Sequence, residues 1–297
     1  MHASVLRYLR EVARRGSVRK AAATLHVASS ALNRQILKVE EELGVRIFDR
    51  LPEGMRLTPA GEVLLRHVRD TLHDYDRLIA EIDGLRGIRS GHVRIAALDS
   101  LLLDLLPGVL EGFAAAYPSV TFAVVGAAPA DVFRQVQAAE ADIGLTFIAP
   151  VGPAVQPVAS IPAPIGAIMA ATHPLAGRRR LSFDELLPFP ALIQRDNLPA
   201  PSFVSDDYAA FRDQVQVRFS SNDIAFIKRL LRSGLGVGFY TRFAFLAEIA
   251  AGEMVWVPLE SPRLAEQRVG LFVPTQRTLS PACAALVSTL AKWLETL

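Results

Sequence analysis

The chain has 297 residues, of which 51% are hydrophobic and 21% are charged. This composition excludes a disordered chain and leaves room for two or three folded domains. The formal net charge of +2 conceals an asymmetry, because residues 1–61 carry a net +5 and the remaining residues a net −3. A basic end on a mildly acidic body favours a polyanionic partner for that end.

The opening residues, MHASVLRYLREVARRGS, lack the apolar run of a secretory signal. No later stretch approaches the roughly 18 uninterrupted apolar residues that a membrane span requires. The single cysteine, Cys283, excludes an internal disulfide framework and a cysteine-rich metal site. We therefore expect a cytoplasmic protein of a reducing compartment, with no membrane partner.

The basic end predicts three helices. Leu6, Leu9, Val12 and Ala13 recur at helical spacing, and Gly16 ends the first helix. Ser17 suits the N-cap of a short second helix over residues 18–25, and a brief turn at residues 26–28 follows. The third helix runs from about Ser29 to Leu43 and is closed by Gly44 at the C′ position.

The third helix has one apolar and one polar face. At 100° per residue, Leu32, Ile36, Val39 and Leu43 share a stripe, while Ser30 and Arg34 point away from it and Asn33 and Lys38 flank it. A short helix, a tight turn and such a helix predict a helix-turn-helix. An Asn can pair with adenine and an Arg fork with guanine, each for about 1–3 kcal/mol of discrimination. The alternative is a helical hairpin whose polar face meets only water.

A basic hairpin follows. The runs RIFDR and MRLT flank the turn at residues 51–54, which predicts a wing with arginines suited to phosphates or the minor groove. Thr58 and Pro59 then suit the N-cap and N1 positions of a long helix to about Arg86. The expected DNA contacts are Arg19, Lys20, Ser29, Ser30, Asn33, Arg34, Lys38, Arg46, Arg50 and Arg56.

The long helix has a narrow apolar seam with charges between its members. The seam residues are Leu64, Val68, Leu72, Tyr75, Leu78 or Ile79, Ile82 and Leu85. A seam of this kind usually pairs with another helix, although it can also pack on the body of its own chain. The segment GIRSG, residues 87–91, suits a hinge.

Beyond the hinge, strands and helices alternate. The sequence predicts a βαβαβ unit with a mostly parallel sheet. Its strands are HVRIAAL, VTFAVVG and DIGLTFI, and its helices span residues 101–118 and 130–141. The chain then crosses to a second lobe and returns near Val269 for a last strand and a helix from about Pro281. Two lobes of this type bound a cleft, and ligands bind at the carboxyl ends of the strands.

The sequence resembles the LysR-type transcriptional regulators. The matches over the first 62 residues are L-R-Y (6–8), G-S (16–17), A-A (21–22), L-H-V (25–27), A-L-x-R-Q-I (31–36), E-E-E-L-G-V-R-I-F-D-R (40–50) and L-T-P-A-G-E (57–62). Further matches are LPGVLEGFAAAYP, ADIGLTF, HPLA, residues 221–240 and RVGLFVP. The family commonly has Ser-Gln-Pro where this chain has Ala28-Ser29-Ser30, and a serine at Asn33. We expect Ser29 to cap the helix instead, and the base preference does not carry over.

The resemblance implies double-stranded DNA, a small-molecule effector and RNA polymerase as partners, in a homodimer or homotetramer joined through the linker helices. It implies an effector domain similar to type 2 periplasmic solute-binding proteins, with a metabolite held between its lobes. Asp99 would oppose an anion there, although helix N–H groups favour one. The candidate effector contacts are Asp99, Ser100, Gly126, Ala127, Thr146, Phe147, Pro201, Ser202, Phe203 and Asn222.

Catalytic motifs are missing from the sequence. It has no HExxH, GxSxG or P-loop, the glycines of SGLGVGFY suit a helix-to-strand turn, and Cys283 lies in an apolar helix. We expect no enzyme, no metal and no cofactor besides the effector. The predicted α/β architecture comprises a winged helix-turn-helix (1–58), a linker helix and hinge (59–90) and a two-lobed effector domain (91–297; lobe I about 91–162 and 269–297, lobe II about 163–268). The alternative function is a two-lobed solute-binding protein without DNA-binding activity.

Overall fold

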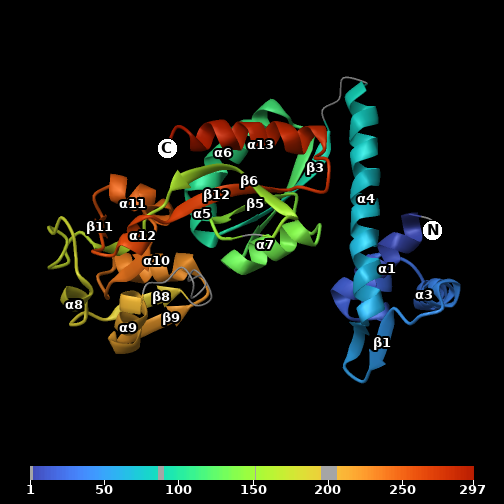
Figure 1. Cartoon of the computed structure of the whole chain (residues 1–297), viewed down its shortest axis with the longest axis horizontal. Coiled ribbons are helices and arrows are strands. Elements are labelled where there is room, and N and C mark those ends of the chain that lie inside the picture. The colour runs from blue at the N-terminus through green and yellow to red at the C-terminus, as the bar shows by residue number, and fades with distance from the viewer. Residues whose placement is uncertain (1–2, 86–89, 151, 195–205) are drawn as a thin grey trace. The chain divides into compact units, whose positions relative to one another are not determined.

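The computed structural model describes residues 3–85, 90–150, 152–194 and 206–297. Two compact units divide the chain, residues 1–86 with 138–140 and residues 87–137 with 141–297. The first unit is helical with one hairpin (Figure 1). Its elements are α1 (Ala3–Arg15), α2 (Val18–Thr24), α3 (Ser29–Leu43), β1 (Phe48–Leu51), β2 (Gly54–Leu57) and α4 (Pro59–Leu85).

The ends of these helices follow the predicted local signals. Ser17 accepts a hydrogen bond from the backbone N–H of Lys20 at 3.4 Å, and Thr58 accepts one from Gly61 at 3.0 Å. Gly16 and Gly44 end α1 and α3 in the left-handed region, with φ of 61° and 68°. The predicted cap at Ser29 is wrong. Ala28 occupies the N-cap and provides no side-chain acceptor, and Ser29 is the first residue of α3.

One hydrophobic core holds the first unit together. Leu6, Leu9 and Val12 of α1 are buried with the apolar stripe of α3, as the helical spacing predicted. Leu43, which was expected in that stripe, is 48% exposed because it lies in the last turn of α3, beyond this core.

The long helix α4 contributes its first half to the same core. Leu65, Val68 and Leu72 are buried there, so this part of the predicted seam packs on its own domain. The spacing predicted Leu64 in this core, but Leu64 is only partly buried and Leu65 is the buried residue there. Further along α4, Tyr75 and Leu78 are exposed. The predicted hinge, 87–91, lies largely outside the described residues.

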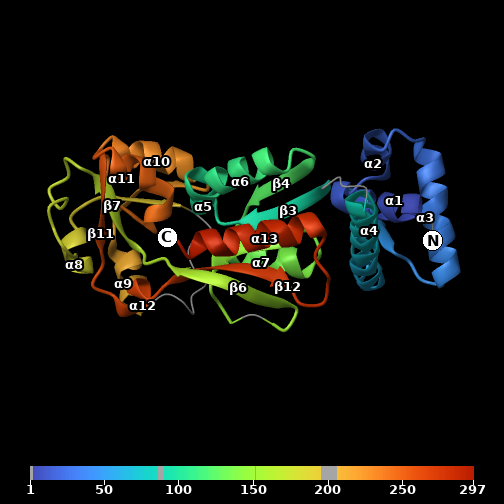
Figure 2. The ribbon, with the colours of Figure 1, turned by 90° about the horizontal axis from the view of Figure 1, so that it is seen from above.

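The second unit contains a five-stranded sheet in the order β4-β3-β5-β12-β6. Its strands are β3 (Gly91–Ala97), β4 (Val120–Gly126), β5 (Ile143–Phe147), β6 (Val155–Pro162) and β12 (Arg268–Pro274). The helices α6 (Leu105–Ala116) and α13 (Pro281–Leu294) cover one face of this sheet and α7 (Pro129–Gln137) the other (Figures 1 and 2). We call this sheet, its helices and α5 (Asp99–Leu103) lobe I.

Lobe II carries two smaller sheets. One is antiparallel, in the order β10-β7-β11, and the other is the parallel pair β8-β9. The strands are β7 (Gly166–Ala170), β8 (Ala191–Gln194), β9 (Val217–Ser221), β10 (Gly238–Tyr240) and β11 (Met254–Pro258). The helices are α8 (Phe183–Leu186), α9 (Asp206–Gln214), α10 (Ile224–Arg232), the 3₁₀ helix η2 (Arg242–Phe245), α11 (Leu246–Ala250) and α12 (Pro262–Ala265).

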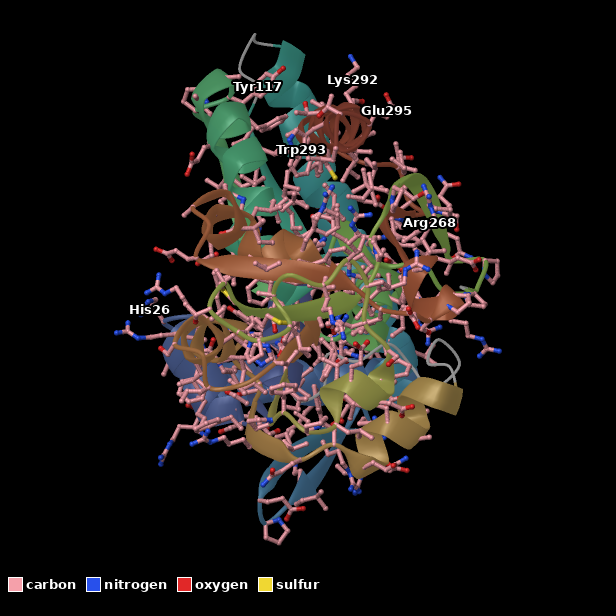
Figure 3. The ribbon with its side chains drawn as sticks, turned by 90° about the vertical axis from the view of Figure 1, so that its left-hand side faces the viewer. His26, Tyr117, Arg268, Lys292, Trp293 and Glu295 are labelled. Atoms are coloured by element: carbon pink, nitrogen blue, oxygen red, sulfur yellow. The ribbon has the colours of Figure 1, made fainter. Side chains whose placement is uncertain are left out.

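The chain passes between the lobes twice, and the two passages are paired. Ala163 donates its backbone N–H to Gln267 at 2.7 Å, and Ile165 donates to Leu264 at 2.9 Å. Beside them, Arg268 (Figure 3) donates from Nη2 to Oγ and the backbone oxygen of Ser160, at 2.9 and 3.0 Å. These bonds fix how the two lobes are joined.

Several details of the second unit differ from the prediction. The helix expected over residues 101–118 is two helices that meet at Asp104, and α5 begins at Asp99, so Asp99 and Ser100 form its first turn. Strand β12 is antiparallel to both of its neighbours, while β3, β4 and β5 are parallel to one another. Strands β6, β9 and β11 were not predicted. Their short runs contain proline or polar residues, which weakens the alternating pattern.

None of the helices in the described part of the chain is long and apolar enough to cross a membrane.

Candidate DNA-binding surface and effector site

The outer face of α3 presents polar side chains over a buried apolar stripe. Ser30, Arg34 and Lys38 are exposed and Asn33 is half-buried, while Leu32 is fully buried beneath them. Arg34 has neither a hydrogen bond nor an ion pair with any residue that the structure describes. Its guanidinium fork is therefore available to a base edge or a phosphate.

A tight turn sets α3 against α2. Val27 donates its backbone N–H to Ala22 at 3.0 Å, and Ala21 and Ala22 are buried to the backbone, which allows the close approach. His26, in this turn, has a φ of 54° and an exposed side chain (Figure 3). A left-handed histidine is tolerated in a single turn position, although it costs some strain.

The wing is held to the rest of the first unit by hydrogen bonds from backbone N–H groups in and beside the hairpin. Met55 of β2 donates to the carbonyl oxygen of Gly16 at 2.8 Å, and a Cβ at Gly54, whose φ is 141°, would overlap that oxygen. Glu40 of α3 accepts from the backbone N–H groups of Ile47 and Phe48, at 2.8 and 3.2 Å. Sequence reasoning missed the part that Glu40 plays, because its partners lie beyond the end of its helix.

The predicted basic contacts occupy exposed positions on three elements. Arg19 and Lys20 are exposed on α2, and Arg46, Arg50 and Arg56 are exposed on and beside the hairpin. Two of the basic residues face carboxylates at 3.9 Å, Arg56 with Asp49 across the hairpin and Lys38 with Glu42 along α3. At this distance and exposure such pairs are weak, so they leave both cations able to meet a phosphate.

Arg50 makes the one bond between two side chains that joins the wing to α3 among the described residues. Its Nη2 donates to Oδ1 of Asn33 at 3.0 Å. The sequence placed both residues at the DNA surface but gave no sign that they contact each other.

In the second unit, Asp99 and Gln194 join the two lobes. Gln194 at the end of β8 donates from Nε2 to Oδ2 of Asp99 in α5 at 2.9 Å, and to the carbonyl oxygen of Asn222 at 3.3 Å. Burial raises the pKa of the Asp99 carboxyl above its usual range. The hydrogen bond from Gln194 lowers this pKa and the charge of Asp223 raises it, but burial is the largest effect. Gln194 was not among the predicted site residues.

Gly126 and Ser100 support Asp99. A Cβ at Gly126 would overlap Oδ1 of Asp99, so only glycine leaves room for the carboxylate at the end of β4. Ser100 is buried beside it in the first turn of α5, and Ala127 donates its backbone N–H to Ala97 at 2.9 Å. These four predicted residues therefore come together at the carboxyl ends of β3 and β4.

The other predicted effector contacts are placed differently. Thr146 is fully buried in β5, and its Oγ1 has no hydrogen-bond partner among the described residues. Phe147 packs in the core of the second unit, so its side chain contacts core residues and is not free to contact an effector. Asn222 contributes its carbonyl oxygen to Gln194. Pro201, Ser202 and Phe203 lie outside the described residues.

A second contact between the lobes is ionic. Lys228 of α10 lies 3.3 Å from Oδ2 of Asp104, at the junction of α5 and α6, and 2.8 Å from Oε2 of Glu248 in α11. All three side chains are mostly buried, so the attraction is less screened than at the surface. Nothing in the local sequence pattern indicated this cluster, because its members lie up to 144 positions apart in the sequence.

The described residues also bear on metal binding and thiol chemistry. Within residues 3–85, 90–150, 152–194 and 206–297, no group of three His, Cys, Asp or Glu side chains is placed to hold a metal ion. Cys283 is buried in α13, where burial raises the pKa of its thiol and keeps it protonated.

Comparison with known proteins agrees with this geometry. The family model for the bacterial regulatory helix-turn-helix protein, lysR family, matches residues 4–62, and the LysR substrate binding domain matches residues 86–295. The transcriptional dual regulator GltC of Bacillus subtilis (strain 168) is 30% identical over 285 residues, covering 93% of this chain and 92% of that protein. The regulator CysB of Haemophilus influenzae is 27% identical over 247 residues, covering 82% of this chain and 76% of that protein.

Solved structures share the fold. A full-length OxyR variant from Pseudomonas aeruginosa has a TM-score of 0.71 at 19% identity, covering 99% of this chain and 95% of that one. Full-length CbnR, in a crystal structure with its target DNA, has a TM-score of 0.61 at 19% identity, covering 99% of this chain and 100% of that one. From its two matched domains and its relatives, the chain belongs to the LysR family of DNA-binding transcription regulators with an effector-binding domain.

Proposed function

We propose that this regulator reads its operator with the outer face of α3 and holds the duplex with the arginines of α2 and the wing. The observation that carries the proposal is the exposed Arg34, which is free of partners among the described residues and stands over a stripe buried on the domain core. Arg34 and Asn33 supply base contacts, and Arg19, Lys20, Lys38, Arg46, Arg50 and Arg56 supply phosphate contacts. Ser29 and Ser30 complete the surface that faces the groove.

We also propose a homo-oligomer, a dimer or tetramer, joined through α4. The first half of α4 is occupied by its own domain, whereas Tyr75 and Leu78 further along the helix are exposed. Two exposed large apolar side chains on one long helix support pairing with the same helix of a second chain. A dimer presents two copies of α3 to one partly palindromic site.

The effector domain provides the regulation in this proposal. A small molecule that binds between the lobes, at Asp99, Ser100, Gly126 and the Gln194 amide, changes how far the lobes close. Because a ligand shifts a conformational equilibrium only by its differential affinity for the two states, the open and closed forms must bind it unequally. The change alters the spacing or bend of the bound DNA and thereby the access of RNA polymerase, in the cytoplasm. No further cofactor is part of the proposal.

In vitro selection from a random duplex pool tests the DNA-binding half of the proposal. We expect the full-length protein to enrich a partly palindromic site at moderate salt. A pool that shows no enrichment would contradict the assignment of the outer face of α3 as the base-reading surface. With an effector in hand, an unchanged footprint and bend at saturation would contradict the regulatory half.

A further inference from the structure

The orientation of the Gln194 side-chain amide is fixed by its neighbours. Its Nε2 donates to two acceptors, Oδ2 of Asp99 and the carbonyl oxygen of Asn222, so nitrogen and oxygen cannot be exchanged without losing both bonds. The Oε1 atom is buried, and no donor among the described residues reaches it. Gln194 is 4% exposed, so this acceptor is withheld from bulk water as well.

A second acceptor lies beside the first. Asp99 uses Oδ2 for Gln194, and its Oδ1 lies against Gly126. Among the described residues no lysine or arginine forms an ion pair with Asp99, and the charge that acts on its pKa is the carboxylate of Asp223. Asp223 is itself held by the backbone N–H groups of Ala225 and Phe226 at the start of α10. The two unused atoms, Oδ1 of Asp99 and Oε1 of Gln194, are therefore both acceptors, and no cation among the described residues pairs with the Asp99 carboxylate.

We propose that the effector presents a cationic, N–H-rich group, an ammonium or guanidinium, to Asp99 Oδ1 and Gln194 Oε1. An ammonium carries three donors and a guanidinium five, enough to satisfy both acceptors at once. A carboxylate in the same place would face a buried acceptor and a like charge, and would lose its hydration without a compensating bond. This inference rests on the proposed effector site and specifies the class of ligand that it takes.

A metal ion fits the same atoms less well. Gln194 turns its NH₂ group, which cannot bind a cation, toward Asp99. Among the described residues, no group of three His, Cys, Asp or Glu side chains could complete a set of metal ligands. Divalent cations that prefer oxygen take six or more ligands, most of them from the protein or from ordered water.

Calorimetric titration of the full-length protein tests the inference. The probes are 1,4-diaminobutane, agmatine and argininamide on one side, and succinate, glutarate and malate on the other. We expect saturable binding of at least one amine or guanidine and of none of the carboxylates. Asp99→Asn should weaken the binding of that cation by about ten- to hundredfold, because it removes the charge while the remaining amide oxygen can still accept from Gln194.

The matched control is Asp213→Asn, an equal change of charge at an exposed carboxylate on α9, and it should bind the cation as the wild type does. Carboxylate binding to the wild type would overturn the inference. So would a panel without a cationic binder, or a cation that binds equally to Asp99→Asn. Thermal unfolding of the same preparations shows that each variant is folded, and a gel shift with the selected duplex follows DNA binding. The gel shift also separates the failures, because retained DNA binding leaves the DNA-binding proposal standing when the ligand class is wrong.

Discussion

The guanidinium of Arg50 in the wing donates from Nη2 to Oδ1 of Asn33 on α3, at 3.0 Å. An asparagine that pairs with adenine uses both its oxygen and its NH₂ group. Because Oδ1 faces Arg50, Nδ2 faces the other way, and the amide is already oriented in the free protein. The wing therefore positions a residue of the proposed base-reading surface as well as contributing positive charge.

This contact predicts that Asn33 and Arg50 act together in DNA binding. The double variant Asn33→Ala, Arg50→Ala should lose less affinity for the selected duplex than the sum of the two single losses, by about 0.5–3 kcal/mol. A double-mutant cycle by fluorescence anisotropy at one salt concentration measures this difference. Strict additivity would mean that Arg50 leaves Asn33 for a phosphate when DNA binds, and that it has no positioning role.

Gly126 is predicted to be required by the Asp99 carboxylate. A Cβ there would overlap Asp99 Oδ1, so Gly126→Ala should push the carboxylate away from Gln194 and cost about 1–3 kcal/mol of unfolding free energy. Gly112→Ala is the matched control. A Cβ at Gly112 meets nothing within 4 Å, and alanine in the middle of α6 should stabilise the protein by about 0.4–1 kcal/mol. Urea denaturation of both variants measures the contrast, and equal stabilisation by both would show that the carboxylate moves freely.

Assembly through α4 is predicted to depend on Leu78. A glutamate at this position places a charge in the proposed helix pairing, so Leu78→Glu should shift the oligomer toward smaller species in sedimentation velocity. Leu43→Glu introduces the same change at a leucine of nearly equal exposure, 48% against 50%, outside α4, and it should leave the distribution unchanged. A Leu78→Glu profile identical to that of the wild type would place the interface elsewhere.

The pKa of Asp99 predicts a difference in stability that depends on pH. Burial raises this pKa in the folded protein, so its protonated form is favoured by folding, and the stability it contributes is lost as pH rises from the ordinary carboxyl range through the raised value. Asparagine cannot ionise, so Asp99→Asn should be more stable than the wild type at neutral pH, and the gap should close toward pH 4. Thermal unfolding of both proteins without ligand, from pH 4 to 8, measures it. A gap that is constant with pH would contradict the assignment of the burial effect.

Local signals in the sequence were sufficient for most of the first unit. Ser17, Gly44 and Thr58 each act on their own helix end, and their roles follow from the identity of one residue and its neighbours. The helix expected at Ser29 begins there, but Ala28 occupies the cap position, because the turn after α2 fixes where the backbone becomes helical. Short-range chemistry is thus predictable, while the exact cap depends on tertiary geometry.

The site residues that sequence reasoning missed are those whose partners are distant. Gln194 meets Asp99 across 95 positions, and Lys228 meets Asp104 across 124. Each pair depends on how the chain crosses between the lobes, at residues 163–165 and 264–267, which no local periodicity records. The sequence could place Asp99 at the end of a strand, but only the folded structure identifies Gln194 as its hydrogen-bond partner.

Selection on a random duplex pool with the wild type, Arg34→Ala and Arg19→Ala in parallel shows whether α3 reads bases with Arg34. If Arg34 reads a base, Arg34→Ala keeps the palindromic site but loses preference at one base pair of each half-site, with about 1–3 kcal/mol less specific binding. Arg19→Ala should keep the whole preference, weaken all sequences alike and lower the salt slope by about one. Identical sites and equal losses on random DNA for both variants would contradict base reading by Arg34.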